Sequence, residues 1–203
     1  MICTAAILLL AAGSAQADFT VGGVNFDDLA GADTLISSVG SYTTAGGSLA
    51  AVLTDNTAET WAWSRAPGDY VDLGFTDNFL VNGAGNDLAV FEIGLPVDLV
   101  PVSLTVGGAT VTKTPVWTGF QVTTYGTYNL NLAVWDLTAD FGLAAGALLD
   151  SIVVVMADVP GANPAQTIGF VGALNSCPVP VPGAVLLGML GLSYAGMKLR
   201  RTK

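Results

Sequence analysis

The chain has 203 residues, of which 52% are hydrophobic and only 11% are charged, with 25 glycines and no histidine. Before the last six residues, two basic residues, Arg65 and Lys113, oppose all sixteen acidic residues, which leaves a net charge near −14 for that part. A surface of this sign repels phosphate backbones and argues against nucleic-acid binding. The absence of histidine removes the Ser-His-Asp and Cys-His catalytic arrangements. The acidic balance suits a secreted protein or a protein that binds divalent cations, and it is equally explained by solubility alone.

The first residues have the pattern of an export signal. MICTAAILLLAAGSAQA contains an apolar run from Ala5 to Ala12, followed by the small-x-small sequence Ala15-Gln16-Ala17. The run is too short to span a bilayer, and the small residues match a signal-peptidase site. We therefore expect a signal peptide over residues 1–17, with Asp18 as the first mature residue.

Cysteine chemistry is limited in the expected mature chain. Cys3 lies in the signal peptide, so Cys177 is the remaining cysteine. An intramolecular disulfide needs a second cysteine, and a Cys/His zinc site needs further cysteine or histidine ligands. The expected mature chain therefore forms neither.

Residues 18–175 have the period-two pattern of an antiparallel β-sandwich. Two segments, Val102–Val106 and Ala109–Thr112, flank Gly107-Gly108, and two glycines permit the positive φ angles of a tight hairpin turn. Many short strands with turn residues between them are typical of sandwiches and barrels. The other expected strands are Tyr70–Phe75, Leu88–Leu95, Trp117–Thr124, Tyr128–Val134, Ser151–Ala157 and Thr167–Val171, and a short helical turn is expected within Asp140–Leu149.

Three segments of this body carry a family resemblance. They are Val52-Leu53-Thr54-Asp55-Asn56-Thr57-Ala58-Glu59-Thr60-Trp61, Tyr70-Val71-Asp72-Leu73-Gly74 and Asn82-Gly83-Ala84-Gly85-Asn86-Asp87-Leu88-Ala89-Val90-Phe91-Glu92. Together they resemble the galactose-binding-like, discoidin-type jelly roll of carbohydrate-binding modules. The resemblance covers about half of the body, and it implies a jelly-roll sandwich, a carbohydrate ligand and a structural calcium ion in a nearby loop.

Asp55, Asn56 and Glu59 are the candidate metal ligands. They place three oxygen donors in one expected loop, and oxygen is the ligand that calcium prefers. An ordinary Asp-Asn turn, in which the side chains bond their own backbone, explains the same residues without a metal. The complete D-x-D-x-D-G calcium loop is not present.

Trp61 and Trp63 are the candidate ligand-binding residues. If their segment is a strand, both side chains lie on one face, where aromatic rings are able to stack on sugars. Tryptophan is mostly buried, so a place for both in the core is the favoured interpretation of the sequence.

An enzyme is the less favoured function class. Glycoside hydrolysis uses two placed carboxylates, and no motif singles out such a pair among the two glutamates and fourteen aspartates. Hydroxyl nucleophiles lack a histidine base in this chain.

Residues 176–203 have the order of a sorting signal: Pro180-Val181-Pro182, an apolar run over Gly183–Leu199, and the basic residues Lys198, Arg200 and Arg201. The run is at the lower limit for a membrane helix, and the basic cluster is expected to stay in the cytoplasm as a membrane stop. The order resembles the PEP-CTERM signal of bacterial proteins handled by exosortases, although valine replaces the central glutamate. That resemblance implies cleavage at the proline motif, display at the cell surface and association with extracellular polysaccharide.

The sequence thus predicts an exported surface protein with a β-sandwich body that binds glycan without catalysis. A structural surface protein without a specific ligand is the first alternative, and an enzyme acting on polysaccharide is the second.

Overall fold

The structure is a computed structural model that describes residues 18–95, 99–156 and 165–179. The expected signal peptide (1–17), the processing motif Pro180-Val181-Pro182, the apolar run and the membrane-stop residues Lys198, Arg200 and Arg201 lie outside the described residues. Within the described residues, neither helix is long and apolar enough to cross a membrane.

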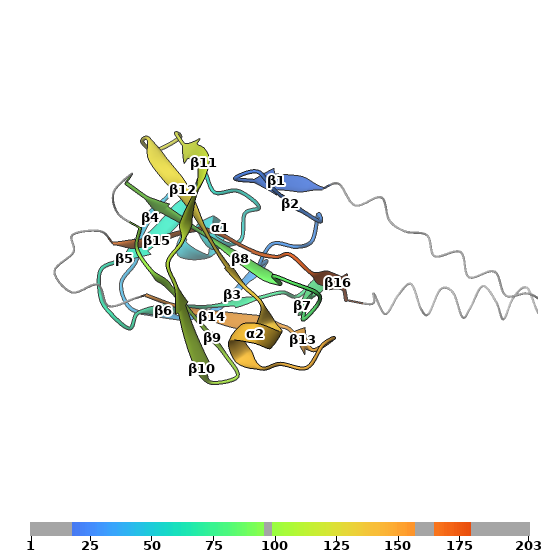
Figure 1. Cartoon of the computed structure of the whole chain (residues 1–203). Helices are drawn as coiled ribbons and strands as arrows, with labels where there is room; N and C mark the ends of the chain where they lie inside the picture. The colour runs from blue at the N-terminus through green and yellow to red at the C-terminus, as the bar shows by residue number, and fades with distance from the viewer. Residues whose placement is uncertain (1–17, 96–98, 157–164, 180–203) are drawn as a thin grey trace, which may run out of the picture.

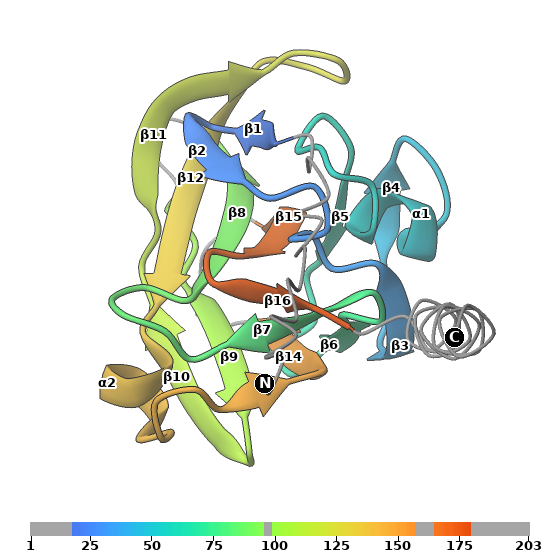
Figure 2. The ribbon, with the colours of Figure 1, turned by 90° about the vertical axis from the view of Figure 1, so that its right-hand side faces the viewer.

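Two antiparallel sheets form the main body, which confirms the mainly β, sandwich-like architecture (Figures 1 and 2). The five-stranded sheet has the order β10 (Ala109–Lys113), β9 (Val102–Val106), β14 (Ser151–Met156), β6 (Tyr70–Gly74) and β3 (Thr34–Val39). The six-stranded sheet has the order β11 (Val116–Val122), β12 (Tyr128–Trp135), β8 (Leu88–Gly94), β15 (Gln166–Ala173), β5 (Trp61–Ser64) and β4 (Thr43–Ala45).

The space between the two sheets holds the main hydrophobic core. Leu73 and Val154 enter it from the five-stranded sheet, and Val90 and Trp135 enter it from the six-stranded sheet, all fully buried. Alternate residues of each strand point to the same face, so the period-two pattern places these side chains together.

A second core covers the other face of the six-stranded sheet. Phe91 of β8 and Phe170 of β15 point away from the main core and pack against Phe26. Phe26 belongs to a hairpin of β1 (Phe19–Val21) and β2 (Val24–Phe26). Because both faces are covered, β8 and β15 are buried along their whole length and are nearly continuous apolar runs.

The predicted hairpin is confirmed at its turn. Val106 pairs with Ala109, and the two residues between them, Gly107 and Gly108, have φ angles of 58° and 83°. Both values lie in the left-handed region that a type I′ turn needs and that side chains other than glycine disfavour. The other expected strands are also present, each with ends within one or two residues of those expected.

The expected helical turn over Asp140–Leu149 is wrong. Helix α2 spans Leu137–Phe141 and ends before most of that range, and Leu148–Leu149 form strand β13. Asp136 caps the helix N-terminus by accepting a hydrogen bond from the backbone N–H of Ala139, and Gly142 ends the helix with a φ of 69°. These caps, rather than the apolar pattern, set the helix boundaries.

Several short elements have no clear signal in the sequence. Helix α1 (Leu49–Leu53) lies beside β4 (Figure 2), and a three-stranded sheet has the order β13, β7 (Asn78–Val81) and β16 (Ser176–Pro178). Since β16 pairs with β7, the folded body includes residues 176–178, beyond the boundary at 175 that the sequence suggests.

Candidate functional site

Strand β5 brings Trp61 and Trp63 to one face of the six-stranded sheet. The segment Trp61–Ser64 is a strand, and the two tryptophans both pack with the second core rather than the main core. Trp63 pairs across the strands with Thr43 of β4 on one side and with Thr167 of β15 on the other. The prediction that the two rings share a face is therefore confirmed.

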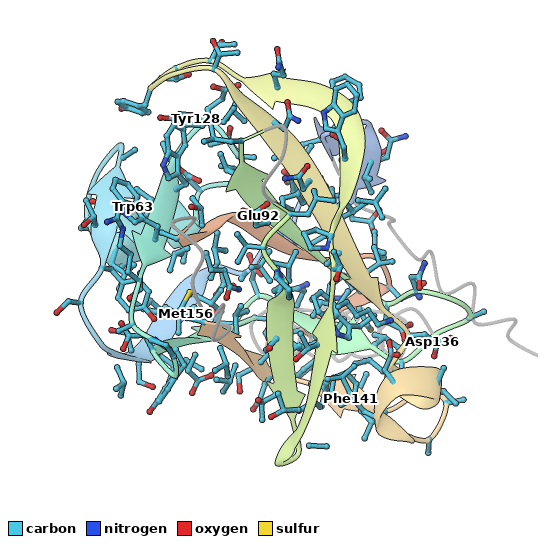
Figure 3. All side chains as sticks on the ribbon, turned by 60° about the vertical axis from the view of Figure 1, so that its left-hand side comes forward. Trp63, Glu92, Tyr128, Asp136, Phe141 and Met156 are labelled. Carbon is cyan, nitrogen blue, oxygen red and sulfur yellow. The ribbon has the colours of Figure 1, made fainter. Side chains whose placement is uncertain are left out.

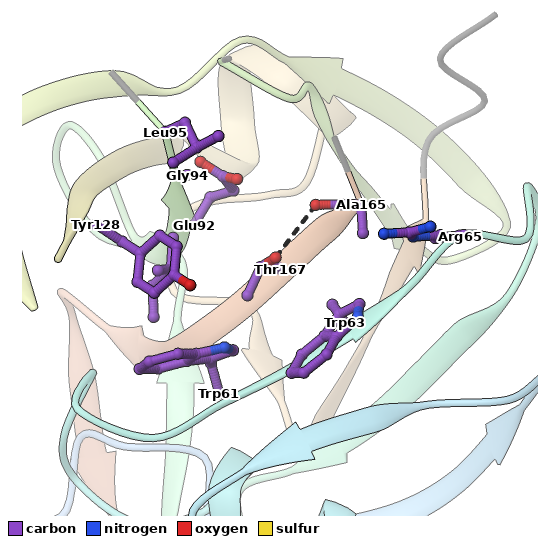
Figure 4. A pocket seen from close by; sticks show the side chains of 10 residues that line it. Trp61, Trp63, Arg65, Glu92, Gly94, Leu95, Tyr128, Ala165 and Thr167 are labelled. Carbon is purple, nitrogen blue, oxygen red and sulfur yellow. Dashed lines mark hydrogen bonds between the residues drawn. The ribbon is translucent and has the colours of Figure 1, made fainter. Parts of the chain in front are cut away.

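The two rings line a pocket at one end of this sheet. Its volume is about 370 Å³, within the range of small-molecule sites. Figure 4 shows Trp61 and Trp63 along one side, with Tyr128 next to Trp61 and Thr167 next to Trp63. The lining residues are Trp61, Trp63, Arg65, Glu92, Ile93, Gly94, Leu95, Tyr128, Ala165 and Thr167.

The two tryptophans have different surroundings. Trp61 is only 6% exposed, and its ring meets Tyr125 and Tyr128 edge to face at centroid distances of 5.6 and 5.5 Å. Trp63 is half-buried, so part of its ring is open to solvent. Trp61 therefore forms the floor of the pocket as a core residue, and Trp63 is the ring that a ligand is able to cover.

Charged groups of both signs lie at this pocket. Arg65 is exposed and has no ion pair within the described residues, whereas Lys113, the other cation of the body, contacts Asp140 at 2.5 Å. Glu92 is buried, and its Oε2 accepts a hydrogen bond of 2.8 Å from Asn131 Nδ2. The guanidinium of Arg65 is thus a donor group that the described chain leaves for a ligand.

The pocket lies far from helix α2. In Figure 3, Trp63 and Tyr128 are on the opposite side of the molecule from Asp136 and Phe141. Of the described lining residues, Trp61 and Trp63 are predictable from the sequence pattern, whereas Tyr128, Arg65 and Thr167 are not. The period of a strand shows which residues share a face, but it does not show which strands are neighbours.

The candidate calcium ligands Asp55, Asn56 and Glu59 each contact a different part of the described chain. Asp55 Oδ2 accepts a hydrogen bond of 2.5 Å from Thr60 Oγ1, and Glu59 Oε2 accepts one of 2.6 Å from Thr124 Oγ1. Asn56 lies against Gly31, where an added Cβ would come within 2.1 Å of its Oδ1. The described residues contain no group of three His, Cys, Asp or Glu arranged for a metal.

Hydrogen bonds and burial shift the pKa values of the Asp55 and Glu59 carboxyls. The hydrogen bond from the Thr124 side chain holds the pKa of Glu59 below its ordinary value, although burial acts in the other direction. Burial raises the pKa of Asp55 despite the hydrogen bond from Thr60. Glu59 also accepts from the backbone N–H groups of Thr123 and Thr124, so it fixes the connection between β11 and β12.

Calcium binding stays a prediction from the sequence, with a direct test. A cation that binds only the folded state stabilises it by about 2.7 kcal/mol at a hundredfold excess over its dissociation constant. The melting temperature is expected to rise in millimolar calcium and to fall again with a chelator. The Asp55→Asn variant should lose the response, and a melting curve that calcium leaves unchanged would end the hypothesis.

A second titratable pair lies where the chain enters β7. Asp33 Oδ2 accepts hydrogen bonds from the Thr76 N–H at 2.8 Å, the Thr76 hydroxyl at 2.9 Å and the Asp77 N–H at 3.0 Å. Burial, a hydrogen bond with the Asp33 side chain and the Asp33 charge together raise the pKa of Asp77 to about 6. The two carboxyls therefore share one proton more readily in the folded protein than in the unfolded chain.

The Asp77 pKa predicts a pH dependence of stability. Because the folded pKa of about 6 exceeds the ordinary value of 3.8, the folded state binds this proton more tightly, and stability falls as pH rises through that interval. An amide at position 77 donates permanently to Asp33, so Asp77→Asn is expected to be more stable than the wild type at pH 7 but not at pH 4. Urea unfolding at both pH values measures this. The exposed Asp18→Asn is the matched control, and equal stability of Asp77→Asn and wild type at pH 7 would contradict the assignment.

Comparisons with known proteins assign no family to this site. No family model matches the chain, and no curated protein matches its sequence.

Proposed function

We propose that the protein binds glycan through the pocket of Trp61, Trp63 and Tyr128, without catalysis, as an exported protein of the cell surface or extracellular matrix. The observation that carries this proposal is the half-buried ring of Trp63 beside Arg65, which has no ion pair within the described residues, in a cavity of about 370 Å³. Aromatic faces carry partial negative charge and attract the C–H groups of a sugar ring, while donors and acceptors at the edge bind its hydroxyls. This combination of apolar walls and a few polar groups is typical of small-molecule sites.

The same lining favours binding over hydrolysis. Among its described residues, Glu92 is the single carboxylate, whereas glycosidases place two carboxyls on either side of the bond that is cleaved. Glu92 is buried and already bonded to Asn131, which suits a positioning role better than proton transfer to a ligand. Turnover of a polysaccharide by the purified protein would favour the enzyme alternative.

The resemblances noted in the sequence extend the proposal. The galactose-binding-like segments support a jelly-roll connectivity of the sandwich and a carbohydrate ligand. The PEP-CTERM-like tail supports export, transient membrane anchoring through Gly183–Leu199 and association with extracellular polysaccharide. Its partner would be an exosortase-type enzyme acting near Pro180-Val181-Pro182, with Lys198, Arg200 and Arg201 as the membrane stop.

The tail gives a prediction that is independent of the pocket. Because prolines do not continue a helix, the processing motif is expected to stay extended and accessible outside the membrane. The mature protein should then lose its last 20 residues or so in a host with the matching enzyme. Intact-mass measurement of the released protein tests this, and recovery of a membrane-bound product ending at Lys203 would leave the tail as a permanent anchor.

A glycan array tests the binding function directly. The wild type should bind a restricted set of glycans, and Trp63→Ala should give much weaker signals for all of them. Binding of no glycan by a folded wild type would favour the structural surface protein without a ligand.

A further inference from the structure

A second cavity lies beside the pocket and shares two residues with it. Its volume is about 410 Å³, and its lining consists of Ser41, Thr43, Trp63, Ser64 and Arg65. Trp63 and Arg65 therefore face both cavities. We propose that the two cavities form one groove that holds an uncharged saccharide chain of at least two units, with Trp63 and Arg65 between the two subsites. This inference rests on the proposed glycan function and specifies its ligand.

The pairing of the strands explains why the ring lies between two subsites. In register, Thr43 of β4 and Thr167 of β15 are the cross-strand neighbours of Trp63, and paired residues point to the same face. Thr43 lines the second cavity, and Thr167 lines the first. Figure 4 shows the Thr167 side of this arrangement, with Arg65 beyond Trp63. A chain crossing the Trp63 ring therefore meets a threonine on either side.

The second cavity offers hydroxyl groups for a saccharide. Within the described residues, the side chains of Ser41 and Thr43 are exposed and make no hydrogen bond. Ser64 is already engaged, because its hydroxyl donates to Asp69 and accepts from the Ala66 N–H. Two available hydroxyls, one guanidinium and one ring edge are the groups that a polar, uncharged chain needs.

The charges near the groove favour an uncharged chain over a polyanion. Asp69 lies behind the second cavity, where it bonds Ser64 and the backbone N–H of Ser41, and Glu92 lies at the first. Arg65 is the one cation among the described residues that line either cavity. The net charge near −14 of the chain before its basic end adds repulsion for acidic polysaccharides.

The dependence of affinity on the length of the saccharide tests whether the two cavities form one groove. The probes are neutral gluco-, galacto- and mannooligosaccharides of one to four units, titrated calorimetrically into the wild-type protein. Affinity for the series that binds is expected to rise at least tenfold between one and three units, because the longer chain reaches both subsites. Equal affinity for one and three units, or tighter binding of a uronic-acid chain than of its neutral counterpart, would overturn the proposal.

The Thr43→Val variant distinguishes a groove with two subsites from a single pocket. The substitution removes one hydroxyl and retains the branched shape that suits a strand. It should reduce the affinity gain between one and three units at least fivefold, whereas Thr110→Val on the other sheet should not alter it. An unchanged gain in Thr43→Val would overturn the second subsite. Failure of every saccharide, monosaccharides included, to bind the folded wild type would instead refute the proposed function itself.

Discussion

Replacing Trp63 by alanine should weaken glycan binding by about 30-fold or more and leave the protein folded. A tryptophan that anchors a ligand contributes about 2 kcal/mol or more to binding, and every 1.4 kcal/mol is a tenfold change in affinity. The ring is half-buried at the surface of the second core, so its loss leaves no closed cavity. Calorimetric titration of the wild type and the variant with a glycan that binds the wild type measures the change.

Trp61→Ala is the matched comparison, with the opposite expected result. Trp61 is 6% exposed and packs between Tyr125 and Tyr128, and truncation of a buried tryptophan costs about 3–5 kcal/mol. The free energy of unfolding should fall by that amount, as chemical denaturation measures it. If Trp61→Ala were as stable as the wild type, or Trp63→Ala as unstable as Trp61→Ala, the division of roles between the two rings would be wrong.

Asp87→Ala should destabilise the protein strongly through lost hydrogen bonds. Asp87 is fully buried, and its Oδ1 accepts from the Gly83 N–H at 2.7 Å and from Asn175 Nδ2 at 2.8 Å. Its Oδ2 accepts from the Leu137 N–H at 2.8 Å. One carboxylate therefore connects the chain before β8, the start of α2 and the chain between β15 and β16.

The expected loss of stability is roughly 3–5 kcal/mol, because hydrogen bonds to charged groups contribute about 1.5–3 kcal/mol each and the buried Leu137 N–H would lose its acceptor. Urea unfolding followed by tryptophan fluorescence measures it. Asp136→Ala is the control, since removal of a helix N-cap costs only about 1 kcal/mol. A loss in Asp87→Ala no larger than that of the control would contradict the assigned role.

The fold was predictable where strands are long and alternate clearly. The hairpin at Gly107-Gly108 and strand β12 have local signals, and both appear as expected. Strands of two to four residues, such as β4 and β16, are too short for a periodic signal and are held by their neighbours. The misplaced helix shows a related limit, because Asp136 and Gly142 end it through capping bonds that the apolar pattern does not contain.

The site was predictable only in part. Alternation along one strand is enough to place Trp61 and Trp63 on one face. Tyr128 is 65 positions further along the chain than Trp63, and it reaches the pocket through the neighbouring order β12, β8, β15 and β5. That order depends on pairing between distant strands, for which a single sequence carries no local signal.

The indole N–H resonances of the four tryptophans give the most direct test of the central claim that glycan binds at Trp63. Trp135 is fully buried in the main core, and Trp117 is 54% exposed on the edge strand β11. During titration with a glycan selected on the array, we expect the Trp63 resonance to shift most, with a smaller shift of the more buried Trp61 in the same pocket. The resonances of Trp117 and Trp135 should stay in place. A shift of Trp117 with Trp63 unmoved would place the glycan on the exposed edge of the sheet and contradict the account.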